Sequence, residues 1–418
     1  MGRRSRRDRL RGAATVASGA VAGCVDTVVD ALGDDCREGT LTEGPTSAGG
    51  TGRWDGYGSG PENDAATSAS GPDDPGLAWR HATCDFLLDR CSPLVADGRV
   101  YVSHRERSGT RALDASSGET LWTPEATGPS VGQAYADGAL YAANGDRFAF
   151  DGADGSVEWR FTPVPRGETA DASPNVLAPL AVADGTVFVT GDAEATWQFA
   201  LDATDGSVRW QRRLAGERER VVPAVGPEAV YAAGAEGELL ALDRETGAVR
   251  WTRRFEAWLE RSAVVGDRLY VTTEGVLHAL SRDGDTEFTV PTGVSAWNVA
   301  VGSERLYVTD STSTLAAFDA ETGEDRWETG GIDEPGKPVV DDSTVYVGGV
   351  DFQGDGGPQP ALYAFDKGSG DRTWRFETRS LRGEDDRPYF GTREQVAVGD
   401  GTLYFTTRAG DLYAVGDR

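Results

Sequence analysis

A short sequence frame recurs along this chain and restricts its fold more than any other feature. Its full form, Ala-x-Asp-x-x-Thr-Gly-x-x-x-Trp, occurs at 241–251 and again at 317–327. Copies that keep the alanine, aspartate, glycine and tryptophan begin at Ala112, Ala149, Ala200 and Ala364. A shorter copy begins at Ala279 and has Phe288 in the tryptophan position, and an eighth copy begins at Ala414. Internal repetition of this kind predicts a fold made of similar units placed side by side.

A second signal precedes each copy of the frame: a turn followed by an alternating apolar run. Asp-Gly turns stand before such runs at 97–98, 137–138 and 184–185, and Asp-Gly between alternating strands is a strong hairpin signal. The glycine inside the frame supplies a second hairpin, because glycine adopts positive φ without strain. Each unit therefore contains four strands, for example 338–341, 344–348, 361–366 and 371–376. Four-stranded units of about 40 residues are typical of β-propeller blades.

The last unit provides an independent test of this interpretation. It has three strands, near 394–399, 402–406 and 411–415, and lacks the outer strand that carries tryptophan. A spare strand at 77–80 contains Trp79 and comes before the first unit. If this strand completes the eighth blade, the ring closes and no blade is left incomplete at an unpaired edge. We therefore predict an all-β, eight-bladed propeller over 77–418, closed by its N-terminal strand.

These frames resemble the repeat of the PQQ-like (pyrroloquinoline quinone) β-propellers. The resemblance implies that the aromatic residue of each frame packs between neighbouring blades. Those blade residues are Trp79, Trp122, Trp159, Trp210, Trp251, Phe288, Trp327 and Trp374. One branch of the family, the quinoprotein dehydrogenases, holds PQQ and calcium on the propeller axis and oxidises alcohols or sugars. Another branch is non-catalytic and includes the outer-membrane assembly lipoprotein of Gram-negative bacteria, so the fold alone does not decide the function.

The chemistry-bearing residues favour the non-catalytic branch. Many of the dehydrogenases carry two adjacent cysteines, and this chain has none. Asp351, Asp355, Asp385 and Asp386 are possible calcium ligands, but aspartate is too common here to discriminate. The segment from Asp351 fails as an EF-hand because its twelfth position is Leu362. We find no histidine doublet, nucleophile elbow or phosphate loop. We expect no catalytic residue, metal or cofactor, with a PQQ- and calcium-dependent dehydrogenase as the alternative.

The N-terminus has the pattern of an export signal. Arginines up to Arg11 precede a mildly apolar run at 12–23, which is too short to span a bilayer. Paired arginines are typical of twin-arginine signals, and Val21-Ala22-Gly23-Cys24 resembles a lipobox. We expect a signal peptide over 1–23 and a lipid on Cys24, which would hold the protein at the outer face of the cytoplasmic membrane. Plain secretion is the alternative.

The next segment, 24–76, is rich in Gly, Ser, Thr and acidic residues. We expect a flexible acidic tether, because such a composition buries little apolar surface. One aromatic island, 53–57, could dock back onto the propeller. After export we expect Cys84 and Cys91 to form a disulfide, and Cys36 then has no cysteine to pair with in the chain.

Charge restricts the partners of the protein. The chain has 68 acidic and 41 basic residues, a net charge of -27, which excludes nucleic acid as a partner. Only Lys337 and Lys367 of the basic residues are lysines. An acidic, lysine-poor surface is typical of proteins that stay soluble in molar salt, so we expect a haloarchaeal source, with a GC-rich genome as the alternative. We expect a monomer.

Long connections gather on one face of the predicted ring. Blade strands alternate in direction, so outer-to-inner connections and those between second and third strands share a face, here called the long-connection face. The expanded connections are 80–91, 161–178, 349–360 and 377–393. Around the closure they would form a rim for a protein partner. The candidate rim residues are Asp85, Phe86, Asp351, Phe352, Gln353, Glu384, Asp385, Asp386, Arg387, Tyr389 and Phe390. The alternative is that these connections are acidic only for solvation.

Overall fold

A computed structural model describes the chain from Gly39 onward, with gaps. The described residues are 39–42, 46, 48–49, 52–56, 58–82, 92–103, 109–124, 132–144, 146–162, 180–192, 196–214, 223–234, 236–265, 268–292, 296–310, 313–352, 359–378, 381–382, 388–389, 395–407 and 410–418. They form strands, turns and irregular segments, and no helix among them could cross a membrane.

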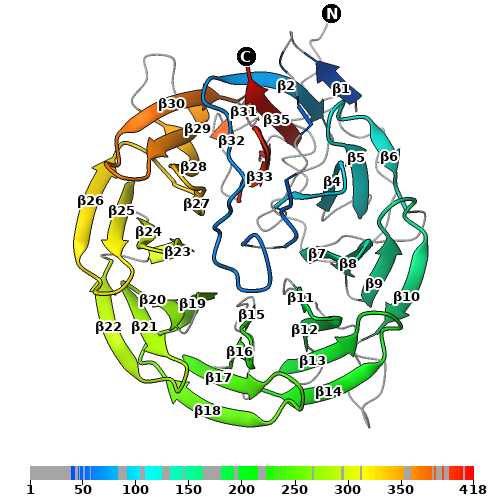
Figure 1. The fold of residues 1–418 in the computed structure, drawn as a ribbon, viewed down its shortest axis with the longest axis vertical. Helices are drawn as coiled ribbons and strands as arrows, with labels where there is room; N and C mark the ends of the chain where they lie inside the picture. The colour runs from blue at the N-terminus through cyan, green and yellow to red at the C-terminus, as the bar shows by residue number, and fades with distance from the viewer. Residues whose placement is uncertain are drawn as a thin grey trace, which may run out of the picture.

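Eight sheets are arranged as blades around a central axis, here called the hub (Figure 1). Seven blades contain four consecutive strands each, which follow one another from the inner to the outer edge. Blade 1 contains β3 (Leu94–Ala96), β4 (Arg99–Ser103), β5 (Thr110–Asp114) and β6 (Thr120–Trp122). Blade 2 contains β7 (Gly132–Ala136), β8 (Ala139–Asn144), β9 (Asp146–Asp151) and β10 (Val157–Phe161). Blade 3 contains β11 (Ala181–Ala183), β12 (Thr186–Asp192), β13 (Thr196–Asp202) and β14 (Val208–Arg213). Blade 4 contains β15 (Ala224–Val225), β16 (Ala229–Ala233), β17 (Glu238–Asp243) and β18 (Val249–Arg254).

The next three blades follow the same order. Blade 5 contains β19 (Leu259–Val265), β20 (Arg268–Thr273), β21 (Val276–Ser281) and β22 (Thr286–Pro291). Blade 6 contains β23 (Ala296–Val301), β24 (Arg305–Asp310), β25 (Thr314–Asp319) and β26 (Asp325–Gly330). Blade 7 contains β27 (Val339–Val340), β28 (Thr344–Asp351), β29 (Gln359–Asp366) and β30 (Arg372–Glu377). A separate two-stranded sheet, β31 (Leu381–Arg382) and β32 (Pro388–Tyr389), follows blade 7.

Blade 8 joins the two ends of the chain, as the sequence predicts. Its inner strands are β33 (Ala397–Gly399), β34 (Thr402–Thr406) and β35 (Asp411–Asp417), and its outer strand is β2 (Pro75–Ala82). β2 runs antiparallel to β35, with Trp79 opposite Ala414. A fifth strand that was not predicted, β1 (Gly39–Thr42), pairs with the outer edge of β2. The N-terminal strand therefore closes the ring, and β1 covers the edge of that blade.

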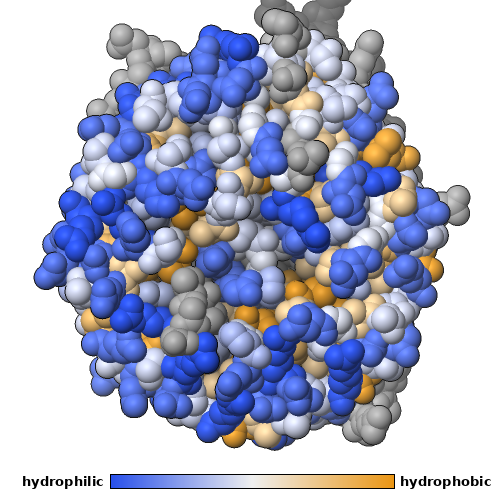
Figure 2. Space-filling model, in the orientation of Figure 1, coloured by the Kyte–Doolittle hydropathy of each residue, from blue (hydrophilic) through white to orange (hydrophobic). Residues whose placement is uncertain are grey.

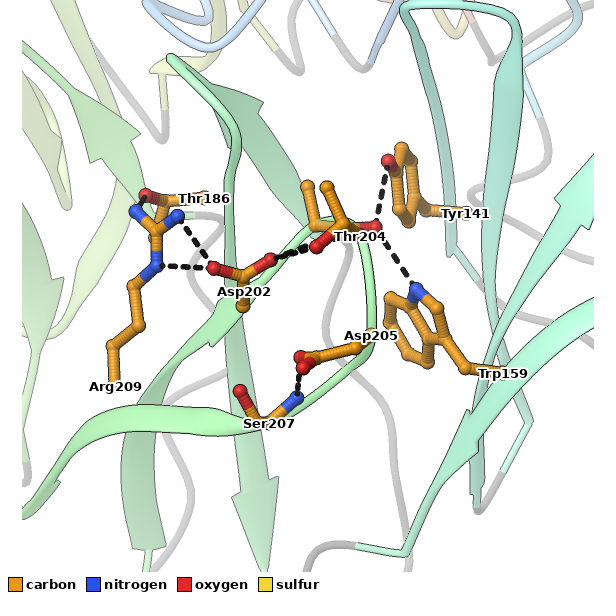
Figure 3. A network of polar contacts seen from close by, with 9 residues as sticks. Tyr141, Trp159, Thr186, Asp202, Thr204, Asp205, Ser207 and Arg209 are labelled. Atoms are coloured by element: carbon orange, nitrogen blue, oxygen red, sulfur yellow. Dashed lines mark hydrogen bonds and ion pairs between the residues drawn. The ribbon is translucent and has the colours of Figure 1, made fainter.

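The aromatic residue of each frame joins its blade to the next one. In Figure 3 the Trp159 indole of blade 2 donates its Nε1 hydrogen to the Ala203 carbonyl of blade 3 at 2.9 Å. The Tyr141 hydroxyl donates to the same carbonyl at 3.2 Å. Gly206 has a φ of 70°, and a Cβ there would lie 2.6 Å from the Trp159 ring. The ring and the turn are therefore fitted to each other, and equivalent indole bonds are made by Trp79, Trp122, Trp210, Trp251 and Trp327.

The frame aspartate holds the turn on which this contact depends. Asp202 Oδ1 accepts from the Thr204 amide at 2.9 Å and from its hydroxyl at 2.5 Å. Arg209 Nη2 donates to the other carboxylate oxygen at 2.8 Å. These hydrogen bonds, the Thr204 hydroxyl first and Arg209 next, hold the pKa of Asp202 well below its usual range. The frame aspartate and Thr204, which lies one residue before the threonine position of the frame, thus hold the turn that carries Gly206.

Blade 5 shows how the frame tolerates Phe288, which has no N–H to donate. The Ala320 carbonyl of blade 6 accepts from the Tyr270 hydroxyl at 3.0 Å, as the equivalent carbonyl does from Tyr141 in blade 2, and Arg268 Nη1 takes the place of the indole N–H, also at 3.0 Å. The Arg268 guanidinium also lies 5.8 Å from the centre of the Phe288 ring. The carbonyl is satisfied without an indole.

Candidate functional site

The segments 52–56 and 58–71, here together called the axial loop, lie across the hub (Figure 1). Trp54 and Ala65 are 0% exposed, and Asn63 is 2% exposed. Trp54 forms an antiparallel bridge with Val95 of β3, and Ala66 forms a parallel bridge with Val340 of β27. The structure therefore differs from the expected flexible tether over this part of 24–76, and the aromatic island does dock through Trp54. The composition was misleading because main-chain bonds, rather than apolar burial alone, hold the loop.

Five blades hold the axial loop through the same backbone group. In each, the donor is the N–H of the inner-strand residue six positions before the tyrosine of the second strand. We call these five N–H groups the hub donors. Each hub donor bonds to a carbonyl oxygen of the loop. The donor and acceptor residues are Val95 and Trp54 (3.0 Å), Tyr135 and Asp55 (2.6 Å), Val225 and Pro61 (2.8 Å), Val301 and Asp64 (2.7 Å), and Val340 and Ala65 (3.0 Å). The repeat thus places equivalent donors around one axis.

The hub donors lie beside the turns that follow the inner strands, on the face opposite the long-connection face. We call this the hairpin face. The end of the axial loop leaves the hub there, where the Gly401 N–H donates to the Ser70 carbonyl at 2.7 Å. Just beyond the loop, the Pro72 carbonyl accepts from Trp374 Nε1 at 3.2 Å. Pro72 therefore replaces the frame turn that blade 8 lacks, and the contact between blades 7 and 8 is completed.

Two buried polar side chains, Lys337 and Gln395, hold the axial loop through hydrogen bonds. Lys337 Nζ donates to Asn63 Oδ1 at 2.9 Å, and Lys337 is 2% exposed. The Gly58 N–H donates to Oε1 of Gln395, which is fully buried, at 2.6 Å. Lysine has a compact ammonium group, unlike the broad planar guanidinium of arginine. A buried lysine with one side-chain acceptor, Asn63 Oδ1, stands here in a chain whose basic residues are otherwise almost all arginine.

Asp64 is the ionisable group of the loop most altered by this setting. Burial raises the pKa of the Asp64 carboxyl to about 6, against hydrogen bonds from Ala66 and Ser59 that favour the charged form. The Ser59 hydroxyl donates to it at 2.9 Å and the Ala66 N–H at 3.2 Å. The nearby charge of Lys337 also favours the carboxylate, but burial dominates.

The backbone of the loop is held in an unusual conformation. Ser59, Asn63 and Ala65 have φ values of 74°, 61° and 60°. Residues other than glycine rarely adopt this left-handed region, and they keep it only where the surroundings fix them. The hub donors and the Lys337–Asn63 bond supply that constraint.

At the level of the hub donors, the protein's own chain occupies the axis. The fully buried Trp54 side chain and the main chain of the loop fill the hub at the level of the hub donors. Over the described ranges, we find no cluster of three His, Cys, Asp or Glu residues able to hold a metal. We derive no redox step at this site.

The predicted rim is described only in part. Asp351 lies at the end of β28 and pairs with Arg375 at 3.4 Å. Phe352 is 45% exposed, and its N–H donates to Asp333 Oδ2 at 3.1 Å. Tyr389 lies in β32, where only its backbone is described. The remaining site predictions lie outside the described residues: Asp85, Phe86, Gln353, Glu384, Asp385, Asp386, Arg387, Phe390, Cys24, Cys84 and Cys91.

Sequence reasoning missed one aromatic residue on the long-connection face. Trp258 lies in the short connection between β18 and β19 and is 59% exposed. This is an outer-to-inner connection, so it leaves from the same face as Phe352. The sequence did contain a sign of this exposed residue, because Trp258 is a tryptophan that belongs to no copy of the repeated frame.

Two polar grooves lie between neighbouring blades on the hairpin face. Their volumes are about 720 Å³ and about 570 Å³. In the first, Arg326 pairs with Asp319 at 2.5 Å, and in the second Arg250 pairs with Glu228 at 2.7 Å. Figure 2 shows a mainly hydrophilic surface with small, separate apolar groups. The grooves mix both charges and their arginines are paired, so they do not form an anion site.

Comparison with known proteins places this architecture in a family. The family model described as outer membrane protein assembly factor BamB matches 64–190, 111–257, 199–298 and 275–417. Solved structures with the same fold include BamB from Moraxella catarrhalis, with a TM-score of 0.61 and 22% identity over 82% of this chain and 97% of that one. They also include the quinohemoprotein alcohol dehydrogenase from Comamonas testosteroni, with a TM-score of 0.66 and 14% identity over 87% of this chain and 80% of that one.

A curated relative matches a smaller part of the chain. The serine/threonine-protein kinase AfsK of Streptomyces griseus is 34% identical over 158 residues, which are 35% of this chain. The match covers only 18% of the length of that protein. The family model, in contrast, matches most of the chain through its overlapping segments. The chain therefore belongs to the family of outer membrane protein assembly factor BamB.

Proposed function

We propose that this protein is a non-catalytic, protein-binding scaffold, exported and held by a lipid on Cys24 at the outer face of the cytoplasmic membrane. The observation that carries the proposal is the axial loop. The dehydrogenase branch uses the propeller axis for its cofactor, and here the main chain of the protein occupies the axis through five equivalent hydrogen bonds. A filled hub favours binding by surfaces over catalysis at the axis.

The long-connection face is the surface that suits a partner. It presents Trp258 and Phe352, the two aromatic side chains among the exposed large apolar residues of the described ranges. Exposed aromatic residues are typical anchors of protein interfaces. A net charge of -27 favours a partner whose matching surface is basic or neutral. The name of the BamB relatives, an assembly factor, agrees with a role in bringing proteins together.

The proposal is tested by calorimetry on the full chain in concentrated salt, titrated with PQQ and calcium. We expect no saturable heat, because the axial loop already occupies the hub. Saturable one-to-one binding would refute the proposal and favour the alternative, a PQQ-dependent dehydrogenase, which a screen of alcohols and sugars would then identify. The variant Trp54→Ala, measured in parallel, shows whether any binding depends on loosening the loop.

A further inference from the structure

The hub donors form a ring of hydrogen-bond donors that could hold other main-chain segments besides the axial loop. Each is a backbone N–H that the pairing between the first and second strands of its blade leaves directed at the axis. Five of them donate to carbonyl oxygens of the axial loop, at 2.6 to 3.0 Å. Because the donors are main-chain groups, their positions are fixed by the repeated blade structure and do not depend on the side chains of the donor residues. A set of N–H groups around an axis is suited to recognise acceptors, and here every acceptor is a peptide carbonyl.

We propose that the hub is a binding site for an extended peptide main chain, which the axial loop occupies in the same molecule. A segment of a partner protein that carries an aromatic residue in the position of Trp54 would bind there in place of the loop. The inference deepens the proposed function and rests on it, since it requires a hub that does not serve a quinone. It resembles the addition of a peptide to an exposed strand edge, where main-chain bonds give affinity and side-chain pockets give specificity.

The geometry favours a peptide over an anion or a small polar ligand. The loop forms strand-like bridges with two inner strands, antiparallel with Val95 and parallel with Val340. Val95 and Trp54 exchange two hydrogen bonds, of 2.8 and 3.0 Å, as two strands do. Each of the five hub donors is satisfied by one carbonyl oxygen of the loop, and these carbonyls come from successive parts of its main chain. Neutral carbonyls satisfy the donors without adding negative charge.

One blade gives an incoming segment a place to start. In blade 3, Val182 occupies the position equivalent to the hub donors. Among the described residues, no bond joins its N–H to the axial loop. A cavity of about 110 Å³ lies at this point, between Val182, Tyr135 and Pro61. A second peptide can therefore begin to pair here before the loop has left the other blades.

The test uses the full chain with 54–66 replaced by a Gly/Ser sequence of equal length. A fluorescent peptide that copies 52–71 is titrated into this variant and into the unaltered chain, and anisotropy is measured. We expect saturable binding to the variant and at least tenfold weaker binding to the unaltered chain. The same peptide with Trp54→Ala is the matched control and should bind the variant at least tenfold more weakly. Equal binding to both proteins, or none to a folded variant, would overturn the inference.

A second measurement covers the case in which the replacement prevents folding. Amide hydrogen exchange is compared between the unaltered full chain and Trp54→Ala. The amides of Val95, Tyr135 and Val340 should exchange at least tenfold faster in the variant, while the Gly206 amide in the blade 3 turn stays unchanged. Unchanged exchange at the hub donors would contradict a displaceable occupant. Binding of PQQ by the unaltered chain would instead refute the proposed function, so the two failures are distinguishable.

Discussion

The fit between turn glycine and indole leads to a prediction with an internal control. Gly206 and Gly185 lie in the same blade with nearly equal φ values, 70° and 66°. A Cβ at Gly206 would lie 2.6 Å from the Trp159 ring, whereas at Gly185 the nearest atom is Arg209 Nη2 at 4.0 Å. Substituting alanine at either position costs about 1–2 kcal/mol for the left-handed backbone. Only Gly206→Ala adds the overpacking of a rigid ring, which costs a further ~1–3 kcal/mol.

The free energy of unfolding of Gly206→Ala should therefore fall by about 2–5 kcal/mol, against about 1–2 kcal/mol for Gly185→Ala. Guanidinium unfolding followed by tryptophan fluorescence and far-UV circular dichroism measures both. The midpoint of Gly206→Ala should lie clearly below that of Gly185→Ala. If the two midpoints fall equally, the indole is not pressed against the turn, and the frame aromatics do not join the blades in this way.

Two further predictions concern the hub. Trp54→Ala should lower the free energy of unfolding by about 3–5 kcal/mol because it empties a fully buried site, while Trp258→Ala, at 59% exposed, should change it by less than ~0.5 kcal/mol. Comparable losses in the two variants would place Trp54 outside the core. Asp64→Asn keeps an acceptor but removes the charge. Because the pKa of Asp64 is raised to about 6 in the folded protein, its ionisation costs stability as pH rises from about 4 to about 6. Unfolding at pH 7.5 should show Asp64→Asn more stable than the unaltered chain by about 1–3 kcal/mol, with no gain near pH 4. A gain that does not change with pH would contradict this assignment.

The blade architecture was predictable because its signals are local and repeated. The turn glycines and the frame tryptophans recur at fixed spacing, and each reports a contact that every blade makes. The closure followed from one missing strand and one spare Trp79. Phe288 shows the limit of the side-chain pattern, since Arg268, which replaces the indole as a donor, comes from another strand of the blade.

The hub was not predictable in the same way. The axial loop is held by backbone N–H groups, which every residue except proline possesses, so no side-chain pattern reveals them. Two residues did give a signal. Trp54 is an aromatic residue in a polar segment, and Lys337 is one of two lysines in the chain. The rim on the long-connection face was inferred from connection length and stays a prediction. Phe352 is exposed on that face, and Trp258 lies in a connection too short to be singled out by length.

The pairing of β2 with β35 has a consequence for the order of folding. Pro75 lies opposite Asp417, so blade 8 closes a contact between nearly the two ends of the described chain. Such long-range contacts are the slowest to form. The axial loop accepts hydrogen bonds from donors in blades 1, 2, 4, 6 and 7, so all of these bonds can form only when most of the ring has folded. The Gly401 N–H of blade 8 also donates to the loop, at Ser70, so we expect the loop to take its final position only after blade 8 has formed and the hub to be the last part of the molecule to fold.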